Sequence, residues 1–295
     1  MKSTSEASSE PTTTRALEWC TPPPELSLPA HAVHVWRADL GLEAAYLRRL
    51  ERNLSADERT RASRFRFARD RDRFVGARGL LREILAPYLN ASPGRLSFGY
   101  GAHGKPFLAE EEHSTLHFNV SHSFDAMLLA IAHLREVGVD VEGVSNIGLA
   151  IDEIGDTVLS EPEKQVLARF DGEDKRTNFL QFWTLKEAYI KADGQGVSLP
   201  LERIDVSAPD GRVAVLDEAA GEWRTCPRWK LRTLAPVPGY VAALAAEGQD
   251  SRLALWHWSP KRAERTRPPR VHAISSSMKS GNRAKNERVP CMGDK

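Results

Sequence analysis

The chain has 295 residues, of which 41% are hydrophobic, so it is long enough to bury one large core or two modest ones. Its 41 basic and 40 acidic residues nearly balance, which argues against a protein that coats nucleic acid. No apolar run approaches the span of a bilayer, the segment 1–15 lacks the apolar core of a signal peptide, and the three cysteines lie too far apart for a disulfide framework or a zinc site. We therefore expect a cytoplasmic protein that binds neither membrane nor nucleic acid.

Both ends of the chain are predicted to lie outside the fold. Residues 1–30 are rich in Ser, Thr and Pro and are interpreted as a disordered lead-in. Residues 259–295 are basic and show no apolar periodicity, so they are interpreted as a disordered tail. Attraction to an acidic partner and a plain solvated extension both account for the charge of this tail.

Between these ends the sequence contains one pattern twice. Residues 54–85 can be laid over residues 159–190, and each copy opens with Leu-Ser and acidic residues, which is a helix-start signature. Strand-like segments precede and follow the copies in the same order, at 33–36 and 126–132 in the first case and at 137–142 and 240–245 in the second. The repeat predicts an α/β (α+β) fold of two similar halves, 31–136 and 137–258, with a ligand cleft between them. Chance similarity between amphipathic helices is the alternative.

Two acidic residues lie in the strand-like segment 137–143. Alternation along a strand places the carboxylates of Asp140 and Glu142 on one face, a few ångströms apart. The flanking valines predict a largely buried strand, in which unpaired carboxylates are costly. We therefore favour a cation between them over a solvent-facing strand edge with two incidental acids. Oxygen ligands without His or Cys indicate magnesium, and magnesium in turn indicates a phosphate substrate.

A third acid is expected from the segment 179–196, which is predicted to be a packed helix. Its aromatic and aliphatic residues mark much of it as buried, so Lys186, Glu187 and Lys191 are predicted to be functional. A Lys-Glu pair on a helix is otherwise ordinary surface charge. The prediction that Glu187 is functional therefore depends on the presence of Asp140 and Glu142 in the same sequence.

Phosphate contacts are predicted in the first half. The segment 118–123 is a strand that ends in small polar residues, where Ser121, His122 and backbone amides are suited to hold a phosphate; a plain turn is the alternative. Lys105, in a Gly- and Pro-containing loop, either grips a phosphate or is solvated. Seven arginines crowd the first copy of the repeat, and those that face the cleft would bind phosphates through the guanidinium fork. They are Arg59, Arg61, Arg64, Arg66, Arg69, Arg71 and Arg73.

The order of these motifs is specific: the Arg-rich helix, GKP at 104–106, FNVSHS at 118–123, VGVDVE at 137–142 and WTLKEAYIKADGQG at 183–196. It resembles the 4'-phosphopantetheinyl transferase superfamily, in particular its larger monomeric type, the surfactin synthetase activator type. The resemblance covers residues 54–200 by motif and is expected to extend over 31–258. It implies a pseudo-dimer of two similar halves with coenzyme A in the cleft, and one functional site per chain.

By motif match, the resemblance implies that Asp140, Glu142 and Glu187 ligate magnesium on the pyrophosphate of coenzyme A. It implies further that Lys105, Ser121 and His122 hold the nucleotide phosphates, that Arg61 and Arg73 reach the ribose 3'-phosphate, and that Lys186 or, preferably, Lys191 contacts the pyrophosphate. One residue departs from the pattern. Glu58 stands where related enzymes usually have a basic residue, and the adjacent Arg59 is the expected substitute.

The implied reaction is attack of a carrier-protein serine on the pyrophosphate, with transfer of 4'-phosphopantetheine and release of adenosine 3',5'-bisphosphate, as in holo-[acyl-carrier-protein] synthases. The base is either Glu187 or Glu163, and an acyl or peptidyl carrier is expected to dock near 194–199. Two other functions are weighed against this one. They are an inactive module that binds coenzyme A or a nucleotide, and a magnesium-dependent phosphohydrolase.

Overall fold

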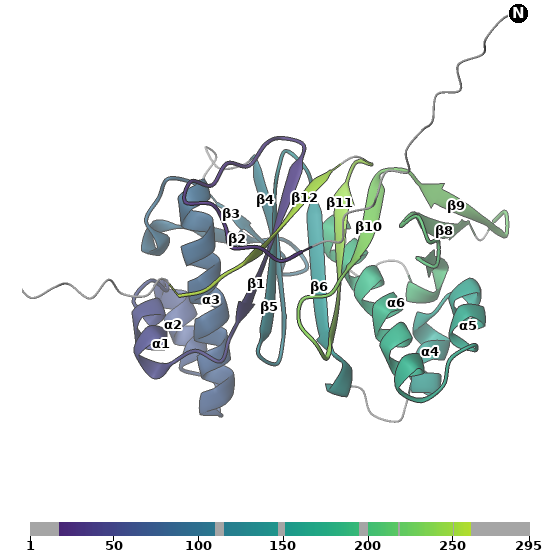
Figure 1. Ribbon diagram of the computed structural model, residues 1–295, viewed down its shortest axis with the longest axis horizontal. Helices are drawn as coiled ribbons and strands as arrows, with labels where there is room; N and C mark the ends of the chain where they lie inside the picture. The colour runs from purple at the N-terminus through teal and green to yellow at the C-terminus, as the bar shows by residue number, and fades with distance from the viewer. Residues whose placement is uncertain are drawn as a thin grey trace, which may run out of the picture. The chain divides into compact units, whose positions relative to one another are not determined.

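The computed structural model describes residues 18–109, 115–146, 151–194, 200–217, 219–249 and 251–260. Residues up to Ser259 form one unit, in which two small sheets lie between two groups of helices (Figure 1). The first sheet has the strand order β12-β1-β5-β4 and the second the order β10-β11-β6. None of the helices in these ranges is both long enough and apolar enough to cross a membrane.

The first half begins with a strand and three helices. Its elements are β1 (Ala32–Asp39), α1 (Ala44–Glu51), α2 (Ala56–Ala62), α3 (Ala68–Tyr88), the 3-10 helix η1 (Pro93–Arg95), β2 (Phe98–Tyr100), β3 (Pro106–Leu108), β4 (Leu116–Ser123) and β5 (Ala126–His133). Ser55 and Glu58 form the capping box that starts α2, as the sequence predicts. The 21-residue helix α3 packs against the sheet.

The second half repeats this order. Its elements are β6 (Val137–Gly143), η3 (Val144–Asn146), α4 (Ile151–Val158), α5 (Glu161–Leu167), α6 (Gly172–Asp193), η4 (Leu201–Arg203), β7 (Ile204–Asp205), β8 (Val213–Asp217), β9 (Glu222–Cys226), β10 (Trp229–Leu234), β11 (Tyr240–Glu247) and β12 (Arg252–His257). Ser160 and Glu163 form the capping box of α5. The 22-residue helix α6 ends at Asp193 and is followed by Gly194, whose positive φ of 72° suits a residue without a side chain.

Strand pairing supports the repeat that the sequence predicts. β5 lies between β1 and β4, antiparallel to both. β11 likewise lies between β6 and β10, antiparallel to both. The strands that correspond in the sequence pattern, β1 with β6 and β5 with β11, therefore hold corresponding places in their sheets.

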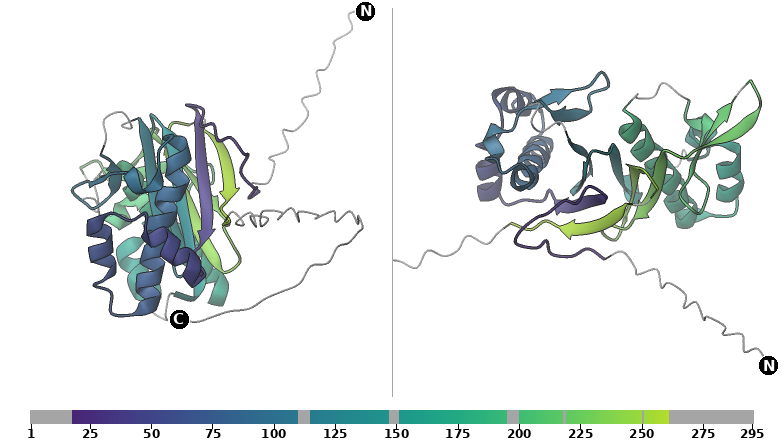
Figure 2. Two further views of the ribbon diagram at one scale, coloured as in Figure 1. Left: turned by 90° about the vertical axis from the view of Figure 1, so that its left-hand side faces the viewer. Right: turned by 90° about the horizontal axis from the view of Figure 1, so that it is seen from above.

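Three apolar clusters separate the layers. One lies between α3 and the first sheet and includes Leu80, Leu81 and Leu129. The second lies between α6 and the second sheet. The third joins the inner faces of the two sheets, with Val33 and Leu128 against Val139 and Leu244. Seen from above, the two sheets lie face to face with helices outside them (Figure 2). Burial of these faces is the main stabilising contribution.

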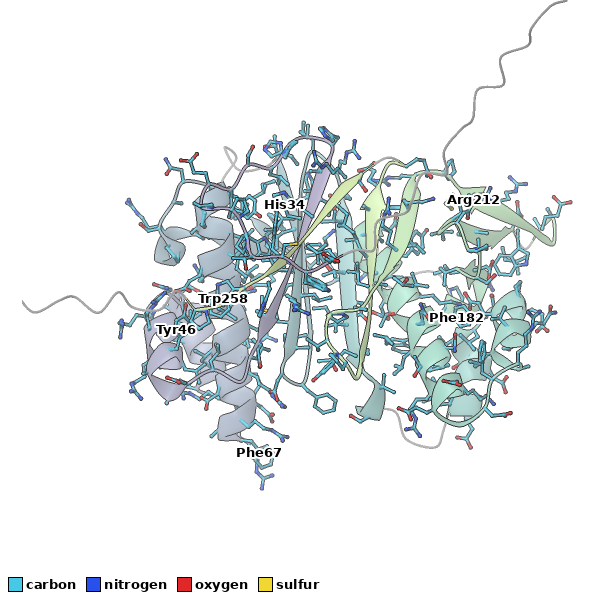
Figure 3. The ribbon with its side chains drawn as sticks, in the orientation of Figure 1. His34, Tyr46, Phe67, Phe182, Arg212 and Trp258 are labelled. Carbon is cyan, nitrogen blue, oxygen red and sulfur yellow. The ribbon has the colours of Figure 1, made fainter. Side chains whose placement is uncertain are left out.

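Two predicted boundaries are wrong. β12, placed by the sequence in the second half, pairs in parallel with β1 of the first sheet. After it, Trp258 packs edge-on against Tyr46 of α1, with ring centroids 5.6 Å apart (Figure 3). Residues 18–30 are also not a free lead-in, because Trp19 donates a hydrogen bond to the Ala235 carbonyl over 2.8 Å, and Leu26 and Leu28 pack against the first core. Apolar residues in a Pro-rich segment therefore bury against the fold.

Candidate active site

β4 and β6 belong to different sheets, and polar side chains join them. Residues 119, 121 and 123 share one face of β4. Ser121 donates a hydrogen bond to Asp140 Oδ1 over 2.8 Å, and Ser123 donates one to Glu142 Oε2 over 2.8 Å. Asn119 accepts a hydrogen bond from the Val139 amide over 2.8 Å. The two acids on β6 are therefore held from the opposite half of the molecule.

Asp140 is buried, with 3% of its surface exposed. Lys191 Nζ lies 2.5 Å from Oδ1 and 3.2 Å from the Ser121 hydroxyl, so it neutralises this side of the carboxylate. The other oxygen, Oδ2, is buried without a hydrogen-bond partner. A buried carboxylate oxygen without a partner is costly and marks a place where a cation fits.

Glu187 of α6 lies one turn before Lys191. Burial raises the pKa of Glu187; Lys191 opposes this shift, and the carboxylates of Asp140 and Glu142 raise the pKa further. The three acids therefore repel one another across the gap between β6 and α6. Within the described ranges, no group of three or more His, Cys, Asp or Glu side chains is close enough to hold a metal ion.

Two pockets lie next to these acids along the face of the first half, and of the three acids Glu187 is a lining residue. One of about 380 Å³ lies among α2, α3, the β2–β3 hairpin and β4, and a neighbouring one of about 470 Å³ reaches α6. They share four lining residues, Gly104, Pro106, Val120 and Lys191, and together form one cleft. Arg61, Ser121 and His122 line the first pocket, and Glu187 lines the second. The sequence predicts all four of these residues at the site.

His122 projects from β4 into the first pocket. Desolvation in this pocket lowers the pKa of His122, and the positive charges of Lys191 and Arg73 lower it further, whereas Glu142 raises it. Arg61 places its guanidinium 5.4 Å from the centroid of Phe74, another lining residue. This pocket is therefore surrounded by cationic groups, as a phosphate-binding pocket requires.

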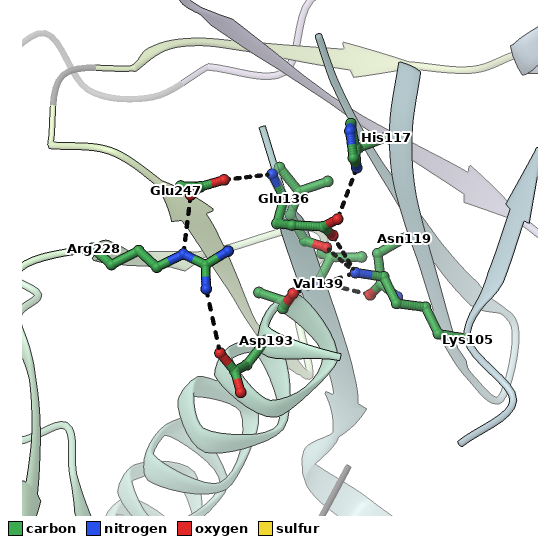
Figure 4. A network of polar contacts seen from close by, with 10 residues as sticks. Lys105, His117, Asn119, Glu136, Val139, Asp193, Arg228 and Glu247 are labelled. Atoms are coloured by element: carbon green, nitrogen blue, oxygen red, sulfur yellow. Dashed lines mark hydrogen bonds and ion pairs between the residues drawn. The ribbon is translucent and has the colours of Figure 1, made fainter. Parts of the chain in front are cut away.

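Arg73 and Lys105, both predicted to bind phosphate, have carboxylate partners. The Arg73 guanidinium contacts Asp125 Oδ1 at 2.8 Å, at the turn between β4 and β5. Lys105 Nζ lies 2.8 Å from Glu136 Oε2 and 3.4 Å from the carbonyl oxygens of Val137 and Ala192 (Figure 4). Lys105 also lines the second pocket. Its side chain is therefore part of the cleft wall, although its ammonium group contacts residues of both halves.

Lys186 and Glu163 are not part of the cleft, which corrects their predicted roles as pyrophosphate contact and base. Both side chains are 0% exposed, with Nζ 2.6 Å from Oε2. Lys186 also donates to the carbonyls of Val158 and Leu201, and Glu163 accepts from the amides of Ser160 and Val206. Helical geometry explains this, because Lys186 lies five residues before Lys191 and faces the opposite side of α6.

Arg59, the expected substitute for Glu58, is not among the residues that line the first pocket. Arg59 is exposed, and its guanidinium donates to the Leu54 carbonyl. Arg78 and Tyr100 line the first pocket instead, although neither is singled out by the motifs. A signal for Arg78 is present in the sequence, since Phe74, Arg78 and Leu81 are spaced to share one helix face. The predicted carrier-docking segment 194–199 lies outside the described residues except for Gly194.

Comparison with known proteins assigns the family. The family model of the 4'-phosphopantetheinyl transferase superfamily matches residues 136–245, and that of the 4'-phosphopantetheinyl transferase N-terminal region matches residues 43–133. The 4'-phosphopantetheinyl transferase HetI of Nostoc sp. is 36% identical over 241 residues, which cover 81% of this chain and 98% of HetI. The chain belongs to the 4'-phosphopantetheinyl transferase superfamily. The resemblance found in its motifs is thus confirmed.

Within this superfamily the chain is of the larger type to which HetI and Sfp belong. The 4'-phosphopantetheinyl transferase Sfp of Bacillus subtilis is 28% identical over 198 residues, 67% of this chain and 84% of Sfp. A solved holo-(acyl-carrier-protein) synthase from Bacillus anthracis matches 40% of this chain with 18% identity and a TM-score of 0.29, a likeness too small to carry an argument. The predicted enzyme class, a 4'-phosphopantetheinyl transferase, is confirmed by the family matches.

Proposed function

We propose that this chain binds coenzyme A in the cleft along β4 and transfers its 4'-phosphopantetheine to a serine of an acyl or peptidyl carrier protein. One observation carries the proposal: Lys191 lines a pocket with other cationic groups and also contacts Asp140, the buried acid of β6. The pocket with Arg61 and His122 suits the nucleotide phosphates, and the acids suit the pyrophosphate with its metal. Family membership supports the same reaction.

The donor chemistry at the acid end suits a magnesium ion, although the three carboxylates are not close enough together in the described structure to hold one. Asp140 offers a buried oxygen without a partner, and Glu187 interacts electrostatically with both Asp140 and Glu142. Oxygen ligands of this kind, next to room for phosphate oxygens, are typical of magnesium in phosphoryl-transfer enzymes. The ion would neutralise charge on the pyrophosphate and on the leaving phosphate. We propose Asp140, Glu142 and Glu187 as its ligands.

The remaining chemistry falls to residues that line the cleft. Lys191, which contacts Asp140 here, is long enough to turn to a substrate phosphate and offset its charge. Of the two bases that the sequence allows, only Glu187 lines the cleft, so we propose it as the proton acceptor. The serine oxygen forms a bond to the β-phosphorus, its proton passes to Glu187, and the bond to adenosine 3',5'-bisphosphate breaks.

Intact-mass measurement of a carrier protein tests the reaction. The enzyme is incubated with an unmodified carrier domain, coenzyme A and magnesium, and we expect the carrier to gain the mass of phosphopantetheine. No gain across fatty-acid, polyketide and peptide carriers contradicts the transferase. Release of adenosine 3',5'-bisphosphate without a carrier would instead indicate a hydrolase.

Replacing Asp140 tests the metal ligands. We expect Asp140→Ala to lower the rate of carrier modification by at least about a hundredfold, because an electrostatic contact to the transferring group is lost. The fold should persist, since the change also relieves repulsion among the three acids. Asp210→Ala, an equal change on an exposed turn, is the control and should leave the rate unchanged. Full activity of Asp140→Ala contradicts the assignment.

A second measurement on the same variants needs no turnover. Magnesium that binds only the folded protein raises the melting temperature by mass action. We therefore expect magnesium with adenosine 5'-diphosphate to raise the melting temperature of the wild type and of Asp210→Ala, but not that of Asp140→Ala. An equal increase in all three proteins places the ion elsewhere.

A further inference from the structure

Glu58, the residue that departs from the family pattern, organises two arginines of α3. It is buried, with 3% of its surface exposed, and its Oε2 accepts the Ser55 amide at 3.0 Å in the capping box of α2. Arg78 contacts Oε1 at 2.6 Å and Arg82 contacts Oε2 at 2.8 Å. Although burial alone would raise it, Arg78, the Ser55 amide and Arg82 hold the pKa of Glu58 below its ordinary value.

One carboxylate faces two guanidinium groups, so this cluster carries one surplus positive charge. Arg82 is 1% exposed and also donates to the carbonyls of Pro93 and Leu96, which makes it an internal cation that neutralises Glu58. Arg78 is 12% exposed and lines the first pocket. The surplus charge is therefore presented to the cleft by Arg78.

The Arg78 guanidinium is fixed in place before any ligand arrives. Its Nη2 donates to the Tyr100 hydroxyl over 2.9 Å, and its carbon lies 5.0 Å from the centroid of Phe98 and 5.8 Å from that of Tyr100. These bonds use Nε and Nη2, and Nη1 has no hydrogen-bond partner among the described residues. A fixed guanidinium with a donor to spare loses little entropy when it binds an anion.

We propose that Arg78 binds the ribose 3'-phosphate of coenzyme A and supplies the cation that Glu58 does not. This inference rests on the proposed function, because it requires coenzyme A in the cleft. Arg61 lines the same pocket, so two guanidinium groups converge there, and a phosphate monoester dianion is the part of coenzyme A that best matches two such groups. Glu58 is therefore a positioning residue. It stands where related enzymes usually have a basic residue, and it holds the Arg78 guanidinium at the pocket instead.

Isothermal titration calorimetry with coenzyme A and with 3'-dephospho-coenzyme A tests the proposal, since the two ligands differ only in this phosphate. The wild type should bind coenzyme A more tightly. Arg78→Gln should weaken coenzyme A binding about tenfold to a hundredfold, the usual effect of losing a charge-assisted hydrogen bond, and leave 3'-dephospho-coenzyme A binding nearly unchanged. Arg78→Lys, which keeps the charge, should retain part of the preference.

The control is Arg48→Gln, an equal charge change at an exposed site on α1, which should bind both ligands like the wild type. Arg78→Gln should fold, because Arg82 still neutralises Glu58. Equal weakening toward both ligands, or an unchanged preference for coenzyme A, overturns the proposal. If the wild type binds coenzyme A with this preference but modifies no carrier, the proposed transferase reaction is contradicted, whereas the proposed binding of the 3'-phosphate by Arg78 stands. A wild type that binds neither ligand overturns both.

Discussion

The ion pair between Lys186 and Glu163 lies wholly inside the second half, where it fixes α6 to the start of α5 and to Val206. Desolvation by burial lowers the pKa of Lys186 and raises that of Glu163, and the attraction between the two groups opposes both shifts. Removing one member of such a pair leaves an uncompensated buried charge, which costs about 3–5 kcal/mol. The pair is therefore structural, not catalytic.

Glu163→Gln should accordingly lower the free energy of unfolding by about 3 kcal/mol or more, measured by urea denaturation at pH 7. The rate of carrier modification per folded molecule should remain that of the wild type, because the side chain does not reach the cleft. Glu161→Gln, in the same turn of α5 but exposed, provides the control for both measurements. A Glu163→Gln enzyme that is stable but inactive would restore Glu163 as the base.

At single positions, the sequence predicts which residues are functional better than it predicts the side of the helix or strand that each side chain faces. Asp140, Glu187 and Lys191 come together as the motifs predict, because strand and helix periods place them on facing surfaces. Lys186, the less preferred of the two candidate lysines, is buried away from the cleft, because the five-residue spacing from Lys191 turns it to the opposite side of α6. Arg78 is missed because its role depends on Glu58, which is twenty residues away in the chain.

At the scale of elements, the contact between β6 and α6 positions the acids relative to Lys191. Gly138 makes this contact possible, since a Cβ built on it would lie 2.0 Å from the Ala188 carbonyl oxygen and 2.4 Å from the Ala192 amide nitrogen. Both atoms belong to the backbone of α6, so the helix as a whole would have to move. The close approach places Asp140, two residues further on, within reach of Lys191.

Gly138→Ala should therefore lower the free energy of unfolding by about 3 kcal/mol or more, at the upper end of overpacking effects. It should also reduce carrier modification per folded molecule, because Lys191 and Glu187 shift with α6. Gly155→Ala in α4 is the matched control: its nearest contact, Leu159 at 3.6 Å, is ordinary, and alanine should stabilise this helix by about 0.5–1 kcal/mol. Equal effects of the two substitutions contradict the account.

Elements themselves are well anticipated by the sequence. Both capping boxes, the long helices and the paired apolar strands follow from local patterns that the structure keeps. What local patterns do not determine is pairing between distant segments. β12 is apolar and alternating like its neighbours, and nothing in its residues indicates that it joins β1 and not β11.

At the scale of the whole molecule, a polar network at one end of β6 connects the two halves. Glu136 accepts from His117 Nδ1 over 2.9 Å and from Lys105 over 2.8 Å, and its amide donates to Glu247, which pairs with Arg228 (Figure 4). The hydrogen bond from His117 is the main cause that lowers the pKa of Glu136 from 4.5 to about 2; burial opposes the shift, and Lys105 adds to it. The network therefore depends on an ionised Glu136.

This network predicts how stability depends on pH. Because the pKa of Glu136 is lower in the folded chain, its contribution is fully present above about pH 4.5 and is lost as the pH falls toward 2. We estimate that ionised Glu136 contributes about 1–2 kcal/mol to the free energy of unfolding. This value is reduced for solvent screening, because the side chain is 32% exposed. Glu136→Gln should lose this amount at pH 7, and its unfolding free energy should approach that of the wild type as the pH falls from 4.5 to 2.

Urea denaturation of both proteins at intervals between pH 7 and 2 measures this convergence, and Glu222→Gln, at the exposed start of β9, controls for the loss of one negative charge. If the unfolding free energies of wild type and Glu136→Gln differ by the same amount at every pH, the packing of the Glu136 side chain and not its charge contributes the stability. Because Lys105 also lines the cleft, loss of Glu136 frees an ammonium group next to the proposed site of coenzyme A. The same variant should therefore bind coenzyme A at least as tightly as the wild type at pH 7 while being less stable. A defect that simply disrupted the fold around Glu136 would lower both the affinity and the stability.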